Sequence, residues 1–279
     1  ATLLGLSALP SDFPLYMGMI GMHGNVAPNV KTNECDVLIA VGMRFDDRVT
    51  GTVSTYAKQA KVIHIDIDPS EIGKIIPVEV GIKGDAKQVL SEITAKMKTL
   101  SHKEWIDSFA KCREIEQKKV IAPETAPGEG YIRMGEVVDC VARVSGGEAI
   151  VVTDVGQNQI WSCAYHVVKN GKFMTSGGMG TMGYSIPAAM GAKLAAPDRQ
   201  VIAVCGDGSF QMSMMELATM RQHGVPVKII VIKNNYLGMV RQYQHFTYKD
   251  HYSVVDLTGS PDLEKLVSAY GIRYLHLDN

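Results

Sequence analysis

The sequence predicts an α/β protein with two domains, each built on a mainly parallel sheet flanked by helices. Short apolar runs alternate along the chain with stretches of helical spacing, which is typical of strands joined by helical crossovers. Several of these runs stop at Gly, Asp or Asn, residues that commonly begin a turn. A length of 279 residues is enough for two domains.

Two strands and a helix are predicted in the first part of the chain. Residues 36–42 form an apolar run that ends in glycine, and residues 61–67 form a second run that is stopped by Asp68-Pro69. From Ala86 to Leu100 the apolar side chains recur at helical spacing. We therefore assign residues 1–100 to a first domain.

The chain changes character between residues 101 and 130. A charged helical segment, His102 to Lys119, is followed by residues 122–130, which are rich in Pro and Gly. Because both residues interrupt regular structure, we expect residues 101–130 to link the first domain to a second one at 131–279.

The second domain should also alternate strands and helices. A helix is expected over 134–144, and Ser213 with Glu216 has the spacing of a capping box, so another helix should begin there and end at Gly224. A final helix should open at Ser260-Pro261. The strands expected in this domain are 149–154, 200–205, 227–232 and 272–277.

Charge and composition exclude several classes of partner. A formal net charge of -1 and a pI near 6.8 argue against capture of nucleic acid, which requires a clustered basic face. No apolar stretch approaches the roughly 20 residues that cross a bilayer, and the first residues lack the pattern of a signal peptide. The cysteines are odd in number and form no CxxC pair, which favours a reducing, cytoplasmic location.

The most informative motif is Gly206-Asp207-Gly208, which directly follows a predicted strand, as Asn234 follows the next one. One strand–helix–strand crossover separates them, so both should lie at the same edge of a parallel sheet, where ligands collect. A carboxylate and an amide oxygen suit Mg²⁺, and flanking glycines let a diphosphate approach the backbone. The alternative, that both motifs are ordinary turns, fits less well with a strand before each of them.

The spacing of Asp207 and Asn234 resembles the motif of thiamine-diphosphate enzymes, in which both side chains and one backbone carbonyl, here that of Tyr236, hold Mg²⁺. The blocks 154–161 and 175–191 resemble the acetolactate synthase version of this cofactor domain. Asn158 departs from the family, in which most members carry His. The cofactor contacts that the resemblance implies are Val155, Gly156, Gln157, Asn158, Gly180, Met182, Gly206, Asp207, Gly208, Ser209, Asn234, Tyr236, Gly238 and Met239.

The resemblance extends to the first domain. Residues 21–24, 42–51 and 64–72 occur in this order in acetolactate synthases, whose Rossmann-like middle domain binds FAD that takes no part in the net reaction. Arginines after a strand that ends in glycine suit a diphosphate, but the chain lacks GxGxxG, and a solvated ion-pair loop is the alternative for residues 44–48. The FAD contacts that the resemblance implies are His23, Gly42, Arg44, Arg48, Val49, Asp66, Ile67 and Asp85.

The family implies an enzyme of branched-chain amino-acid biosynthesis that decarboxylates pyruvate on thiamine diphosphate and condenses the enamine with a second 2-ketoacid. It also implies a homodimer or homotetramer and a possible small regulatory subunit. Met239 and Tyr243 would line the substrate side, and members that favour 2-ketobutyrate usually carry Trp in place of Tyr243. The family's activating Glu comes from an amino-terminal domain of the partner subunit, so we expect this chain alone to be inactive.

Other functions stay open on the sequence. Pyruvate oxidase, glyoxylate carboligase and decarboxylases share the Asp and Asn motif, although residues 44–51 and 176–183 favour acetolactate synthase. A nicotinamide dehydrogenase shares only the alternating pattern and is disfavoured by the missing glycine fingerprint. A nucleotide-binding regulatory module is the alternative that is not an enzyme.

Overall fold

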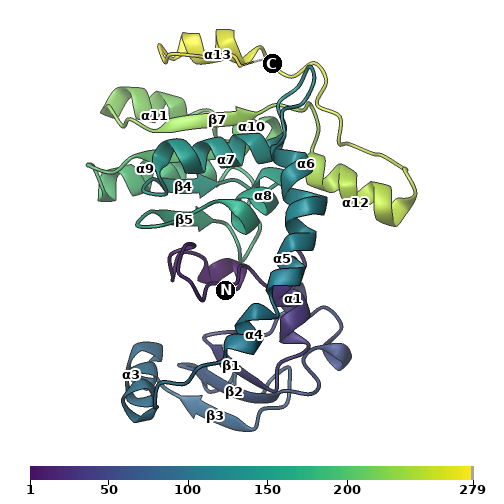
Figure 1. The fold of residues 1–279 in the computed structure, drawn as a ribbon. Coiled ribbons are helices and arrows are strands. Elements are labelled where there is room, and N and C mark those ends of the chain that lie inside the picture. The colour runs from purple at the N-terminus through teal and green to yellow at the C-terminus, as the bar shows by residue number, and fades with distance from the viewer. Residues whose placement is uncertain (278–279) are drawn as a thin grey trace. The chain divides into compact units, whose positions relative to one another are not determined.

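Two parallel sheets organise the protein in the computed structural model, which describes residues 1–277 (Figure 1). Every strand pair in both sheets is parallel, which confirms the predicted α/β class. The first sheet has the order β1-β2-β3, with β1 (Val37–Val41), β2 (Lys61–Asp66) and β3 (Val80–Lys83). The second has the order β5-β4-β6-β7, with β4 (Ile150–Thr153), β5 (Lys172–Thr175), β6 (Val201–Gly206) and β7 (Lys228–Ile232).

By contact the chain separates into two compact units. The first is formed by Ala1–Gly5 and Met17–Val120, and the second by Leu6–Tyr16 and the chain from Ile121 onward. The segment Leu6–Tyr16 belongs to the second unit because Ser11 N donates to Val168 O at 2.6 Å. The assignment of domains to residues 1–100 and 131–279 stays a prediction.

The first unit packs short helices around its three strands. Its core holds Ala40, Phe45, Val62 and Ile76 from the strands and their connections. The helix predicted to reach Leu100 ends earlier, because the backbone is already extended at the next residue after Lys96. Its helical elements are η1 (Leu3–Gly5), α1 (Val26–Thr32), α2 (Asp47–Thr50), η2 (Val53–Thr55), α3 (Ala86–Lys96), α4 (Lys103–Asp107), α5 (Ala110–Glu116) and the π-helical turn η3 (Gln117–Ile121), which runs on into the second unit.

The segment rich in Pro and Gly is more ordered than its composition indicates. It begins with a helical turn, α6 (Ala122–Thr125), where an irregular linker was expected. Pro123 lies in the first turn of this helix, a place where a missing N–H breaks no helical hydrogen bond. The assignment of residues 101–130 as a linker between domains stays a prediction.

The second unit surrounds its sheet with most of the remaining helices. Strand β4 is buried at every position and β6 at all but its last, as expected for central strands of a parallel sheet. Helix α9 packs on both strands and contributes Ala189 to their core. The helices not yet given are α7 (Met134–Ser145), α8 (Gln157–Tyr165), α9 (Ser185–Ala195), α10 (Asp207–Ser213), α11 (Glu216–His223), α12 (Gly238–Tyr248) and α13 (Leu263–Ala269).

The prediction for the crossover from β6 to β7 is confirmed in its topology, but the predicted start of the helix was wrong. The two strands are parallel and joined by α10 and α11, as the motif spacing predicts, and Gly224 ends α11 in the left-handed conformation. However, Ser213 caps no helix. It is the last residue of α10, which begins at Asp207, and the N-cap of α11 is Met215. The chain turns into a helix directly after the glycine, several residues earlier than predicted.

The end of the described chain also differs from expectation. The last helix begins at Leu263, where Asp262 accepts a hydrogen bond from Lys265 N, rather than at Ser260. The strand predicted over 272–277 does not form, because Ile272 packs against the core cluster beside α13 and its N–H donates to Val267 O. Within residues 1–277 no helix is long and apolar enough to cross a bilayer.

Candidate functional site

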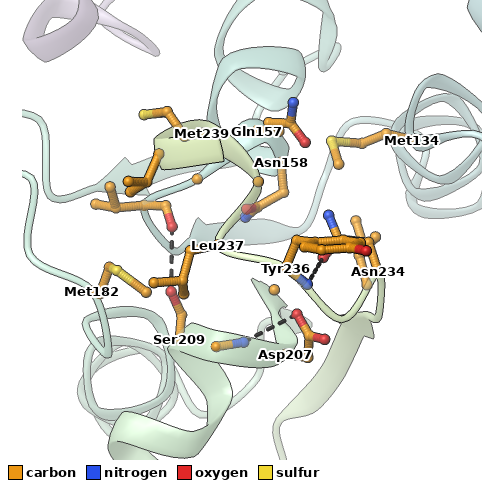
Figure 2. Close-up of a pocket in the computed structure, with 17 residues that line it drawn as sticks. Met134, Gln157, Asn158, Met182, Asp207, Ser209, Asn234, Tyr236, Leu237 and Met239 are labelled. Atoms are coloured by element: carbon orange, nitrogen blue, oxygen red, sulfur yellow. Dashed lines mark hydrogen bonds between the residues drawn. The ribbon is translucent and has the colours of Figure 1, made fainter. Parts of the chain in front are cut away.

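The carboxyl ends of β4, β6 and β7 converge on a pocket within the second unit (Figure 2). The register pairs Thr153 with Val204 and Gly206 with Ile232, so the residues that follow these strands lie at one edge of the sheet. Helix α12 supplies a further wall. The pocket is lined by Met134, Val155, Gly156, Gln157, Asn158, Met182, Gly206, Asp207, Gly208, Ser209, Ile232, Asn234, Tyr236, Leu237, Gly238, Met239 and Val240.

Asp207 links two of these strand ends. Its side chain is almost completely buried, with 2% exposed, because it is the first residue of α10 and points back under the loop after β7. One carboxylate oxygen accepts from Gly208 N at 3.1 Å, and the other accepts from Asn235 N at 2.8 Å. A helix N-terminus and two N–H donors are a favourable place for a buried negative charge.

Asn234 lies in the turn after β7, next to Asn235, whose N–H donates to Asp207. The Oδ1 of Asn234 accepts from Tyr236 N at 2.9 Å, and Asn235 between them adopts a left-handed conformation with φ 59°. Asn235 therefore uses its backbone N–H to bind Asp207, while its neighbour Asn234 lines the pocket. A carboxylate, an amide oxygen and a backbone carbonyl are all hard oxygen donors, which fits Mg²⁺.

Glycines line the pocket where there is no room for a side chain. A Cβ added at Gly208 would lie 2.6 Å from Leu237 Cδ2, and one added at Gly238 would lie 2.5 Å from Gln157 Oε1. Gly156, the N-cap of α8, has φ 150°, a conformation that other residues rarely adopt. These positions leave the backbone open to a bulky anion such as a diphosphate.

Asn158 has a structural connection that its sequence motif does not reveal. It is buried, and its Nδ2 donates to Asp154 O at 3.1 Å and to Val204 O at 3.2 Å. Both N–H groups of the amide therefore join the ends of β4 and β6. Asn158 lines the pocket, but its donor capacity is already used by the backbone.

The remaining predicted cofactor residues divide into two groups. Ser209 donates to Val155 O at 3.3 Å, and Gln157 donates to Gln242 Oε1 at 3.2 Å, so both are held within the pocket wall. Gly180 is exposed and lies outside the pocket lining. Tyr243, which was predicted as a substrate residue, is 59% exposed and also lies outside the lining. The residues of the lining that the sequence did not indicate are Met134 and Ile232.

A buried thiol and a second buried carboxylate lie in and after the central strands that lead to the pocket. Cys205 is completely buried in β6, and burial is the main reason that the pKa of its thiol is raised, with the nearby Asp154 and Asp207 adding to it. Asp154 follows β4, is also completely buried, and accepts three backbone hydrogen bonds. Sequence reasoning placed Asp154 at the start of a motif but gave it no role.

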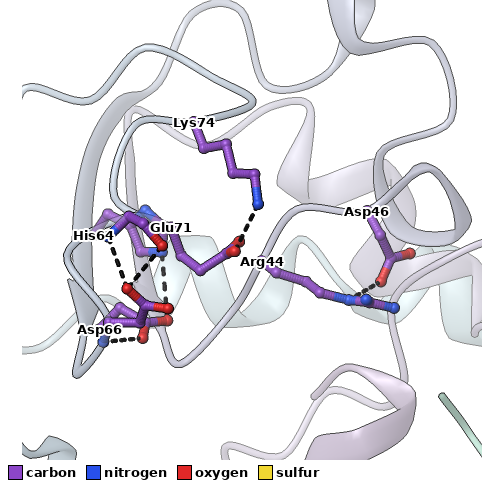
Figure 3. Close-up of polar contacts among 8 residues, drawn as sticks. Arg44, Asp46, His64, Asp66, Glu71 and Lys74 are labelled. Atoms are coloured by element: carbon purple, nitrogen blue, oxygen red, sulfur yellow. Dashed lines mark hydrogen bonds and ion pairs between the residues drawn. The ribbon is translucent and has the colours of Figure 1, made fainter.

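The residues predicted to bind FAD lie in the first unit, and Figure 3 shows two of them, Arg44 and Asp66. Arg44 Nε pairs with Asp46 Oδ2 at 3.0 Å, and Arg48 pairs with Asp47 at 3.3 Å. Both arginines are mostly exposed, so these ion pairs contribute little to stability. An anionic ligand could therefore replace the aspartates as the partner of each arginine at little cost in free energy. Gly42 follows β1 with φ 59°, which lets the chain turn toward this loop.

The other residues of this group lie at the ends of the neighbouring strands. Asp66 ends β2 and accepts from Asp68 N at 2.9 Å, Ile67 is 70% exposed, and Asp85 caps α3 through Gln88 N. His64 Nε2 lies 4.0 Å from Asp66 Oδ2, too far for a hydrogen bond.

His23 and Val49 complete the set of predicted FAD residues. The pKa of His23 is lowered, mainly by burial and to a lesser extent by Arg48. Val49 lies in α2, beside Arg48. Together, the predicted FAD residues occupy the ends of β1 and β2, helix α2 and the start of α3, and His23 lies in the loop before α1, near Arg48.

Two family models match the sequence. The model of the C-terminal thiamine pyrophosphate (TPP) binding domain of thiamine pyrophosphate enzymes matches residues 154–279, and the central domain of the same enzymes matches residues 1–93. The first match begins at the end of β4 and contains all but one of the residues that line the pocket.

Similar proteins are found in bacteria and archaea. The chain is 43% identical to the acetolactate synthase large subunit of Lactococcus lactis, with 100% of this chain and 48% of the relative aligned. It is 42% identical to a probable acetolactate synthase large subunit of Methanocaldococcus jannaschii (98% and 47% aligned) and 41% identical to the acetolactate synthase isozyme 2 large subunit of Escherichia coli (99% and 49% aligned). The chain thus spans about half the length of the curated relatives it matches. It belongs to the thiamine pyrophosphate enzymes, and over its whole length it is homologous to acetolactate synthase large subunits.

Proposed function

We propose that this chain is the cofactor-binding part of an acetolactate synthase catalytic subunit, which decarboxylates pyruvate and joins the remaining fragment to a second 2-ketoacid. The observation that carries the proposal is the pocket in which buried Asp207 and exposed Asn234 follow adjacent parallel strands. The homology to acetolactate synthase large subunits supports this choice among thiamine pyrophosphate enzymes.

Mg²⁺ is the metal we propose for the pocket. Asp207, Asn234 and the carbonyl of Tyr236 would hold it. Asp207 is buried, and no Lys, Arg or His within residues 1–277 forms an ion pair with it. Since an uncompensated buried carboxylate is costly, a cation fits this position. The three donors carry a single negative charge, so a bound diphosphate would supply the rest of the metal's oxygen ligands.

The chain's own residues bind and orient the cofactor. Thiamine diphosphate, when bound, supplies carbanion chemistry that no side chain provides. Gly156 and Gly208 let the backbone approach the diphosphate, since neither position has space for a side chain. Met182, Leu237 and Met239 give the pocket an apolar wall, which excludes water from the reacting end.

Proton transfer requires a group that this pocket lacks. Asp207 is the only carboxylate among the described residues that line it, and the lining holds no His, Lys or Glu. We therefore propose that another domain or subunit supplies the activating Glu. The present 279 residues alone would then bind the cofactor without turning over pyruvate.

The first unit is proposed as a site for FAD without a redox role, within a domain of residues 1–100. Its support is the pair of exposed arginines, Arg44 and Arg48, beside the strand end that carries Asp66. A homodimer or homotetramer, a small regulatory subunit and a cytoplasmic location complete the proposal. Tyr243, on the exposed face of α12, would influence the choice of second 2-ketoacid.

The products formed from pyruvate test the proposed activity. The complete gene product, supplied with pyruvate, thiamine diphosphate and Mg²⁺, should form acetolactate, whereas residues 1–279 alone should form none. Acetaldehyde or acetyl phosphate as the main product of the complete protein would point to a decarboxylase or an oxidase instead. Substantial acetolactate formation by residues 1–279 would contradict the proposed external Glu.

A further inference from the structure

Asp154 is a fully buried carboxylate just outside the pocket lining. It follows β4, and its exposed fraction is 0%. Oδ1 accepts from Val155 N and from Gly183 N, each at 2.9 Å, and Oδ2 accepts from Ser185 N at 2.9 Å. The last two donors lie about thirty positions along the chain. The carboxylate therefore joins the end of a central strand to a distant segment.

This distant segment is the turn that leads into α9. Ser185 is the first residue of α9, so Asp154 places a negative charge at the N-terminus of an 11-residue helix. Gly183 adopts φ 83°, and a Cβ added there would lie 3.0 Å from Met212 Cβ. The turn is thus fixed by Asp154 on one side and by close packing on Met212 on the other.

The turn carries a residue of the pocket. Met182 immediately precedes Gly183 and lines the pocket, and its Cε lies 3.7 Å from the position of a Cβ added at Gly208. Asp207, by contrast, accepts from Gly208 N and Asn235 N, and Asn234 accepts from Tyr236 N. The two buried aspartates therefore hold different segments of the pocket wall, and the segment that Asp154 holds contributes the apolar side chain of Met182.

The negative charge of Asp154 has no cationic partner. No ion pair among residues 1–277 includes it, so its burial is compensated by backbone N–H groups. A neutral amide in its place would keep one acceptor oxygen and turn a donor toward Gly183 N or Ser185 N. At least one of these two hydrogen bonds would then be lost.

We propose that Asp154 is a positioning residue that fixes the turn carrying Met182, and that it thereby sets the affinity for the thiamine part of the cofactor but not for its diphosphate. This inference rests on the proposed function of the pocket. A general role of Asp154 in folding would have a different effect, because it would weaken the binding of the thiamine part and of the diphosphate together.

The test compares Asp154→Asn with Asp198→Asn, an exposed carboxylate of the same unit. In the full chain, Asp154→Asn should weaken thiamine diphosphate binding roughly tenfold in the presence of Mg²⁺, as is usual for a residue that supports a contact residue. Its affinity for inorganic diphosphate with Mg²⁺ should stay within about twofold of wild type. Amide exchange of Gly183 and Ser185, measured without ligand, should accelerate, and Asp198→Asn should match wild type throughout.

Other outcomes of this experiment would contradict either the positioning role of Asp154 or the proposed function. Equal loss of affinity for both ligands, or unchanged amide exchange at Gly183 and Ser185, would overturn the positioning role. If Asp154→Asn does not fold, Met182→Ala tests the same turn: thiamine diphosphate should bind more weakly and diphosphate as before, and unchanged thiamine diphosphate affinity would refute the proposal. A wild-type chain that binds neither ligand would instead contradict the proposed function.

Discussion

Two buried aspartates follow neighbouring strands, but their surroundings suit them to different tasks. Asp154 accepts three backbone hydrogen bonds and lies outside the pocket lining. Asp207 accepts two and lines the pocket beside Asn234. A carboxylate offers about four acceptor sites, so Asp207 retains capacity for a cation. At the scale of single residues, the number of backbone partners separates the positioning carboxylate from the proposed ligand.

His166 should make the stability of the second unit depend on pH. It is the C-cap of α8, and burial lowers its pKa from 6.5 to about 4, against a smaller opposing effect of a hydrogen bond with the backbone of Val138. The unfolded chain therefore binds a proton below about pH 6.5, whereas the folded chain stays neutral down to about pH 4. Stability present above pH 6.5 is lost as the pH falls, by about 3 kcal/mol in total.

Urea unfolding at pH 7.5 and pH 4.5 checks this prediction. The wild-type chain should lose more free energy of unfolding between these values than His166→Gln, whose amide does not titrate. Ordinary histidines titrate alike in both chains, so their contributions cancel in the comparison. The same pH dependence in wild type and variant would show that His166 is protonated equally in the folded and unfolded states.

At the scale of elements, prediction succeeded where the apolar run is long, including the edge strands β1 and β7, and failed at the shorter edge strands β3 and β5. Strands β4 and β6 are central and almost wholly buried, so their apolar runs were unmistakable. Strands β3 and β5 were not predicted, because they are short and only partly buried. The expected strand at 272–277 failed for a related reason, since an apolar run alone does not say what it packs against.

The candidate site shows the same division. The shared position of Asp207 and Asn234 followed from crossover topology, which the sequence reveals. The backbone bonds of Asn158 and Asp154 did not, because their partners lie on other strands or in the turn before α9. Met134 was missed because it enters the lining only through the packing of α7 near the pocket.

Helix α12 is held to the pocket by one side-chain pair that can be tested. Gln242 accepts a hydrogen bond from Gln157 at 3.2 Å, whereas Gln244 on the same helix bonds Ser253. Removing Gln242 frees the start of α8, so Gln242→Ala should accelerate amide exchange at residues 157–159 about fivefold, the effect of one net hydrogen bond.

Gln244→Ala is the matched control for this experiment. It removes a glutamine from the same exposed helix without touching Gln157, so exchange at residues 157–159 should stay as in wild type. Equal acceleration in both variants would mean that exchange reports general loosening of α12. No acceleration in Gln242→Ala would mean that this pair does not hold the pocket wall.

At the scale of the whole molecule, the second unit contains a pocket well suited to an anion and a metal, and the described residues that line it include no His, Lys or Glu for proton transfer. The second unit supplies hard oxygen donors, glycines and an apolar wall, and the described lining offers no second carboxylate. The first unit carries exposed arginines at a strand end. The chain spans about half the length of the curated relatives it matches.

Calorimetric titration of the full chain with thiamine diphosphate tests the central claim most directly, that Asp207 and Asn234 bind the cofactor through a metal ion. We predict binding in the presence of Mg²⁺, loss of binding with EDTA, and an affinity at least about 100-fold weaker in Asp207→Asn, because a lost metal ligand should cost more than a lost supporting contact. Asp198→Asn should bind as wild type does. Binding that is independent of Mg²⁺, or equal in Asp207→Asn and wild type, would contradict the claim.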